Sequence, residues 1–111
     1  MPRDSRVYLD DILEATRKIT AYTGSHSKAT FLEDEKTLDA VVRNLEVIGE
    51  AVKKLPENLR AKHSTVEWKK IAGLRDILIH EYFGLDAGIV WDIVQNKVPA
   101  LDREIRTMLN E

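Results

Sequence analysis

Residues 38–55 read LDAVVRNLEVIGEAVKKL, and this stretch decides the fold. Its apolar residues recur at alternating steps of three and four, which places them on one face of an α-helix. They are Leu38, Val41, Leu45, Ile48, Val52 and Leu55. A long helix with a continuous apolar face is suited to packing against other helices. We therefore predict a helix from Glu35 to Leu55, ended by Pro56.

The same spacing appears on both sides of this stretch. It predicts a first helix over Ser5–Thr23, capped by Asp4 or Ser5 and stopped at Gly24. Residues 25–34 lack a clear period and are predicted to form a loop. The string Ser64–Glu67 is typical of a capping box and predicts the start of a third main helix.

We expect the third helix to run to about Phe83 and to stop at Gly84. A last helix, capped by Asp86, is expected to be kinked or split at Pro99. No stretch alternates as a strand does. The prediction is an all-α fold, an antiparallel bundle of four main helices in which residues 1–111 form a single domain.

Composition excludes several classes of protein. The 17 Lys and Arg residues nearly balance the 19 Asp and Glu residues, and a net charge of −2 argues against a broad basic surface for duplex DNA. The absence of Cys excludes disulfides and thiolate metal sites. No long apolar run or leader-like segment is present, so we expect a cytoplasmic protein. We also expect that it needs no cofactor.

Glycine inside the central helix carries structural information. Gly49 lies beside the apolar face, where glycine costs about 1 kcal/mol relative to alanine. We predict that a neighbouring helix approaches closely at this position.

Histidine is the first candidate for acid–base chemistry, because it titrates near neutrality. His26 and His63 lie in polar connectors, and we expect both to be solvated. His80 differs, because it lies in an apolar helix five residues after Arg75. About the axis of an α-helix, His80 lies about 140° from Arg75, whereas Tyr82 lies on the same face as Arg75. A second copy of this helix at a two-fold axis would bring the guanidinium and imidazole groups into one cleft.

Guanidinium and imidazole groups together suffice for RNA cleavage without a metal ion. The guanidinium binds phosphate through paired hydrogen bonds, and the imidazole moves protons at the ribose 2′-oxygen and the leaving oxygen. No metal-ligand motif is present in the sequence. The alternative is structural: Asp76 pairs with His80 one turn away, and Arg75 pairs with a carboxylate elsewhere.

A second polar cluster interrupts the central helix. Arg43, Glu46 and Glu50 share one face at spacings of three and four, with Asn44 beside them. They form either a solvated, salt-bridged stripe or a polar cluster that faces the Arg75/His80 cleft and orients it or holds the dimer.

Residues 68–82, WKKIAGLRDILIHEY, resemble the signature of the HEPN superfamily, and more narrowly the HepT toxins of HepT–MntA systems. The motif is Arg, four residues, His, one residue, Tyr, which here corresponds to Arg75, His80 and Tyr82. Residues 43–51, RNLEVIGEA, are also similar to that family. One departure is Asp76, where relatives often carry Asn; a carboxylate there would repel RNA phosphate.

The resemblance implies the toxin of a type VII toxin–antitoxin system. It implies a homodimer with a composite cleft, metal-independent ribonuclease activity, and Arg75 and His80 as catalytic residues. It also implies an MntA-like nucleotidyltransferase antitoxin that silences the nuclease by transferring AMP to Tyr82. Two alternatives stay open: a non-catalytic subunit that binds the transferase or a nucleotide, and a purely structural helical dimer.

Overall fold

The computed structural model describes residues 4–80 and 84–111, and all regular secondary structure in these residues is helical. The elements are α1 (Ser5–Thr23), α2 (Lys28–Leu32), α3 (Glu35–Lys54), α4 (Glu57–Lys62), α5 (Trp68–His80), α6 (Ala87–Asn96) and α7 (Val98–Leu109). This confirms the predicted all-α class. No helix in the described part of the chain is both long and apolar enough to cross a membrane.

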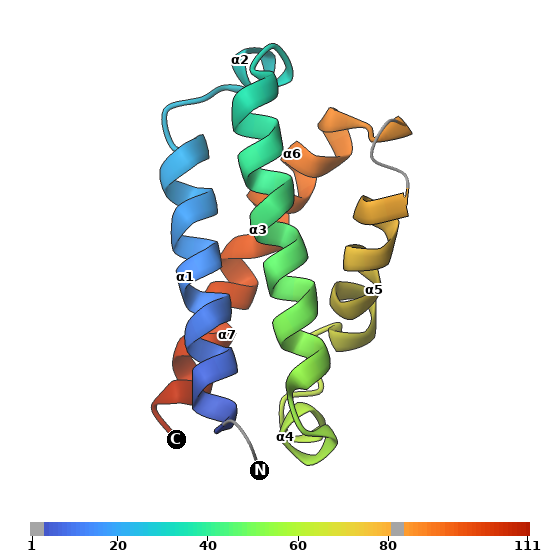
Figure 1. Ribbon diagram of the computed structural model, residues 1–111. Coiled ribbons are helices and arrows are strands. Elements are labelled where there is room, and N and C mark those ends of the chain that lie inside the picture. The colour runs from blue at the N-terminus through green and yellow to red at the C-terminus, as the bar shows by residue number, and fades with distance from the viewer. Residues whose placement is uncertain (1–3, 81–83) are drawn as a thin grey trace.

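The central helix α3 organises the molecule. It packs between α1 and α5, and α7 packs against α1 (Figure 1). The predicted apolar face of α3 is buried: Val41 and Val52 have no exposed surface, and Leu45 and Ile48 are 2% exposed. Because α5 makes its main contacts with α3 alone, α3 sets the position of the motif helix.

The segment predicted to be a loop contains a short helix, α2. Ser27 accepts from the backbone N–H of Thr30, whose hydroxyl accepts in turn from the backbone N–H of Ser27, so the helix starts with a capping box. Phe31 is fully buried, and its ring lies 5.2 Å from that of Trp91. The loop prediction was wrong because five residues are too few to show a helical period.

The start of α5 also differs from the prediction. The helix begins at Trp68, after a turn at residues 63–66, so Ser64–Glu67 is not its capping box. The indole N–H of Trp68 instead donates to the carbonyl oxygens of Arg60 and His63, at 3.1 and 3.0 Å. These bonds fix the entry to the motif helix. The predicted end, near Phe83, lies outside the described residues.

The predicted break near Pro99 lies two residues earlier in the structure. Helix α6 ends at Asn96 and α7 begins at Val98, with Lys97 between them. Pro99 occupies the first turn of α7. Backbone N–H groups in the first turn have no partner within the helix, so the missing N–H of proline costs no helical hydrogen bond there. Asp86 caps α6 as expected, with its carboxylate accepting from the N–H of Gly88.

Candidate active site between α3 and α5

Helices α3 and α5 approach each other most closely at Gly49. A Cβ added to Gly49 would lie 2.9 Å from the Cβ of Arg75 and 3.1 Å from the carbonyl oxygen of Ile71. Real Cβ atoms essentially never come as close as 2.9 Å to such a neighbour. The predicted close approach is confirmed, and its partner is the motif arginine.

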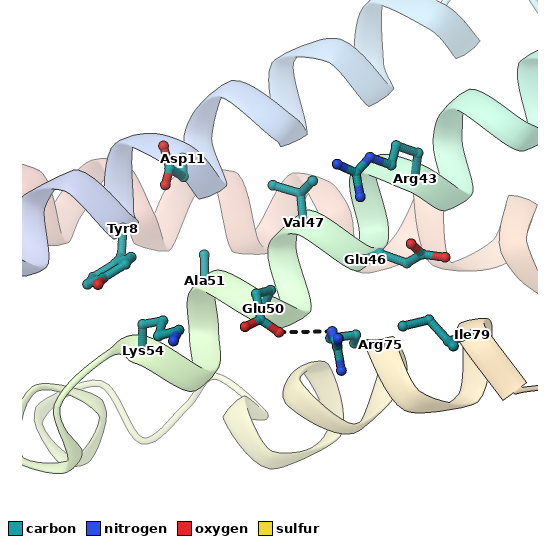
Figure 2. Close-up of a pocket in the computed structure, with 10 residues that line it drawn as sticks. All are labelled: Tyr8, Asp11, Arg43, Glu46, Val47, Glu50, Ala51, Lys54, Arg75 and Ile79. Carbon is teal, nitrogen blue, oxygen red and sulfur yellow. Dashed lines mark ion pairs between the residues drawn. The ribbon is translucent and has the colours of Figure 1, made fainter.

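Arg75 is held by carboxylates on two sides. Its Nε lies 2.8 Å from Oε2 of Glu50 in an ion pair (Figure 2). Its Nη1 donates to Oδ1 of Asp76 at 3.3 Å. The side chain of Arg75 remains 35% exposed. A guanidinium has five N–H donors in a planar fork, so these contacts leave donors available for an anion.

Arg75 lies at a groove of about 340 Å³ formed by α1, α3 and α5. We call it the Arg75 groove (Figure 2). It is lined by Tyr8, Asp11, Arg43, Glu46, Val47, Glu50, Ala51, Lys54, Arg75 and Ile79. The polar stripe of α3 therefore lines the same groove as Arg75, and its role in orienting the cleft or holding the dimer stays a prediction.

Further polar residues line the groove. Lys54 extends the stripe that starts at Arg43 by a further step of four from Glu50, so its spacing contains the signal. Tyr8 and Asp11 come from α1, and no local pattern shows which face of α1 meets the groove. The lining carries three cationic and three anionic side chains, so the groove has no net formal charge.

Asn44 does not belong to the Arg75 groove, contrary to the expectation that it supports the cleft. It is only 9% exposed, and its Nδ2 donates to the carbonyl oxygen of Ala40 at 2.8 Å. One residue along a helix is a rotation of about 100°, so Asn44 points away from the direction of Arg43. It satisfies its amide within α3 itself.

His80 and Asp76 lie beside the groove rather than in it. His80 is the last residue of α5 and is exposed, and it does not line the Arg75 groove. Asp76 contacts Arg75 and also lies 3.6 Å from Nζ of Lys53, which are partners other than the His80 of the structural alternative. Within one chain, Arg75 lines the groove and His80 does not. Tyr82 lies outside the described residues.

The other two histidines are not the solvated residues that we expected. His63 is 8% exposed, with Nδ1 at 2.7 Å from Glu104 and Nε2 at 2.8 Å from Glu111. These two carboxylates, that of Glu104 first, raise the pKa of His63 above its ordinary value. His26 is also partnered, with Nδ1 at 3.0 Å from the Thr30 hydroxyl. The expectation failed because these partners are set by tertiary structure.

Potential metal ligands are dispersed in the described part of the chain. Among residues 4–80 and 84–111, no group of three or more His, Cys, Asp or Glu side chains is arranged to hold a metal ion. The groups that the structure offers for chemistry are therefore a guanidinium, an exposed imidazole and the carboxylates around them.

Comparison with known proteins identifies the family. Residues 12–108 match the model of the HepT-like family, described as "Ribonuclease HepT-like". The "Putative RNase MJ0127" of Methanocaldococcus jannaschii is 50% identical over 112 aligned residues, which cover all of this chain and 93% of that protein. The "Putative RNase TTE0752" of Caldanaerobacter subterraneus subsp. tengcongensis is 42% identical, with 96% of this chain and 95% of that protein covered.

A third relative carries the family name itself. The "Probable ribonuclease HepT" of Thermococcus cleftensis is 42% identical over 101 residues, covering 91% of this chain and 92% of that protein. No solved structure gives a significant match. The match to the family model covers most of the chain, and these relatives are aligned over nearly their full lengths. The chain therefore belongs to the HepT-like ribonucleases of the HEPN superfamily.

Proposed function

We propose that this chain is the ribonuclease toxin of a toxin–antitoxin pair, and that it cleaves RNA with Arg75 and His80 without a metal ion. The observation that carries the proposal is how Arg75 is held between α3 and α5. Its backbone lies against Gly49, and its guanidinium is bound by Glu50 at the mouth of the Arg75 groove. Family membership supplies the reaction class.

The chemistry follows from the two side chains. The guanidinium of Arg75 binds the scissile phosphate and stabilises the charge that develops on its oxygens. The neutral imidazole of one His80 takes the proton from the ribose 2′-hydroxyl, whose oxygen then attacks phosphorus. A protonated imidazole gives a proton to the departing 5′-oxygen. The products are a 2′,3′-cyclic phosphate and a free 5′-hydroxyl.

The proposal places this site at the interface of a homodimer. His80 is exposed and does not line the Arg75 groove of its own chain, so a second chain is the natural source of an imidazole for that groove. The motif helix also exposes two large apolar side chains, Ile77 at 54% and Ile79 at 44%. Burying them against a second copy would stabilise the dimer by the hydrophobic effect.

Regulation is proposed to act on Tyr82. An MntA-like nucleotidyltransferase antitoxin transfers AMP from ATP to its hydroxyl, forming a phosphodiester with release of pyrophosphate. Tyr82 follows Arg75 by seven residues, so the attached phosphate would compete with RNA for the guanidinium. Modification would thus block the substrate at its anion-binding group.

The test of the nuclease is RNA cleavage by purified protein in excess chelator. We expect Arg75→Ala and His80→Ala to lose cleavage by at least about 100-fold, the usual scale of acid–base help. His26→Ala is the control, because His26 does not line the Arg75 groove and its Nδ1 lies 3.0 Å from the Thr30 hydroxyl. Equal cleavage by all four proteins would identify a contaminating nuclease. A wild-type chain that binds the transferase without cutting RNA would favour the non-catalytic binding subunit.

The test of regulation is intact and peptide mass spectrometry after co-expression with the cognate transferase. We expect one or more AMP masses on the peptide that contains Tyr82, and none in Tyr82→Phe. Modification confined to Tyr8 or Tyr22 would contradict the proposal.

A further inference from the structure

We infer that Glu50 is a positioning residue for Arg75, and that it determines which edge of the guanidinium faces RNA. This inference rests on the proposed ribonuclease function. It assigns a role in the reaction to a side chain of α3, outside the motif helix that carries Arg75 and His80.

The geometry around Arg75 defines the contact. Glu50 follows Gly49 directly, so the residue that allows α5 to approach and the residue that binds Arg75 are neighbours on α3. Nε of Arg75 lies 2.8 Å from Oε2 of Glu50, and the dashed line in Figure 2 marks this ion pair. With Glu50 on the Nε side and one N–H of Nη1 donating to Asp76, the other N–H of Nη1 and the two of Nη2 are the donors left to bind a phosphate.

Because the Arg75–Glu50 ion pair is partly exposed, its effect on catalysis can be measured apart from its effect on stability. The side chains of Arg75 and Glu50 are 35% and 48% exposed, and ion pairs this exposed contribute little to folding. The orientation of a phosphate-binding fork is far more sensitive, since a misplacement of about 1 Å lowers rates by about 100-fold. Loss of the Glu50 carboxylate should therefore affect catalysis and leave the fold intact.

Glu35 provides a control. It has the same chemistry and lies on the same helix, exposed in the first turn of α3, and it does not line the Arg75 groove. Among the described residues, the ion pairs of Arg75 are with Glu50 and Asp76. Glu50→Gln and Glu35→Gln thus remove the same charge from α3, and only the first removes an ion-pair partner of Arg75.

The first measurement is steady-state cleavage of a short RNA by the full chain. We expect Glu50→Gln to lower kcat by about 10- to 100-fold with a smaller change in KM, and Glu35→Gln to stay within about threefold of wild type. Glu50→Asp, which keeps the charge on a shorter side chain, should recover part of the loss. Thermal unfolding should be nearly unchanged in all three variants. Equal kcat in wild type and Glu50→Gln would overturn the inference.

The second measurement needs no RNA. In 15N-labelled protein, the Nε–H signal of Arg75, assigned by its absence in Arg75→Lys, should exchange slowly with water in wild type and Glu35→Gln. It should exchange much faster in Glu50→Gln. An unchanged signal would overturn the positioning role. A wild-type chain that cuts no RNA would overturn the proposed function instead, and this signal alone would then decide whether Glu50 fixes Arg75.

Discussion

Arg75 lies over Gly49 at a distance that only a glycine allows, with 2.9 Å between the Cβ of Arg75 and the point where a Cβ of residue 49 would stand. The contact joins the central helix to the motif helix at the residue proposed to bind phosphate. Much of the position of Arg75 is therefore determined by α3, through Gly49 beneath its backbone and Glu50 beside its guanidinium.

We expect Gly49→Ala to lower both stability and RNA cleavage. Alanine gains about 1 kcal/mol of helix propensity. The added methyl also meets the carbonyl oxygen of Ile71 at 3.1 Å, and backbone cannot rotate away. Overpacking of this kind costs about 1–3 kcal/mol, so we expect a net loss of about 1 kcal/mol in the free energy of unfolding measured with denaturant.

Gly73→Ala is the control for that substitution. Gly73 lies in the interior of α5, and nothing within 4 Å would meet an added Cβ. Only the gain in helix propensity applies there, so we expect Gly73→Ala to raise the free energy of unfolding by up to about 1 kcal/mol. If both substitutions stabilised the protein equally, the close approach at Gly49 would not be a constraint.

The sequence predicted the parts of the fold that depend on local pattern. The bounds of α1, the buried face of α3 and the cap at Asp86 follow from spacing and capping residues alone. Gly49 was informative because an unfavourable residue in a long helix needs a packing reason. The polar stripe from Arg43 to Glu50 was visible too, although its direction required a second helix beside it.

What the sequence did not reveal depends on distant partners. His63 appeared to be an ordinary connector residue because its two glutamates are 41 and 48 residues away in the sequence. Asn44 appeared to belong with Arg43, but its side chain turns back to bind Ala40. The short helix α2 buries one residue, Phe31, and a single buried residue cannot show the helical spacing of apolar residues.

Substitution of Asp76 should strengthen RNA binding. Its carboxylate lies 3.3 Å from Nη1 of Arg75, on the edge proposed for phosphate, and is 54% exposed. We expect Asp76→Asn to lower KM for RNA by about two- to fivefold, the scale of an exposed ion pair. The gain should shrink as salt screens the charge.

Asp92→Asn is the control for Asp76→Asn. It makes the same change in net charge at an exposed position of α6, where Asp92 accepts from Asn96. KM measured at two salt concentrations should stay at the wild-type value. A KM for Asp76→Asn equal to that of Asp92→Asn would show that Asp76 does not compete with phosphate.

The proposed dimer makes a specific prediction for the exposed face of α5. Ile77 is 54% exposed beside the motif residues, and a lysine there would place a charge in the interface. We expect Ile77→Lys to sediment as a monomer, to keep its helical circular dichroism and to lose RNA cleavage. Leu32→Lys, at a 48% exposed leucine of α2, should remain dimeric and active. If Ile77→Lys were dimeric and active, the exposed face of α5 would not form the dimer interface.

The His63 cluster should make stability depend on pH. His63 bridges the turn before α5 to Glu104 of α7 and to Glu111, and these carboxylates raise its pKa. A raised folded-state pKa means that the folded protein binds the proton more tightly than the unfolded chain does. The stabilisation is therefore complete below the ordinary value of 6.5 and is lost as pH rises through the folded-state pKa.

The measurement is the free energy of unfolding of wild type and His63→Gln between about pH 5 and pH 9, a range that spans histidine titration. We expect the advantage of wild type to be largest at the acidic end and to shrink steadily towards pH 9. Glu104→Gln should flatten this dependence, because it removes the carboxylate that raises the pKa of His63 most. A constant difference between wild type and His63→Gln over the whole range would mean that His63 acts by packing alone.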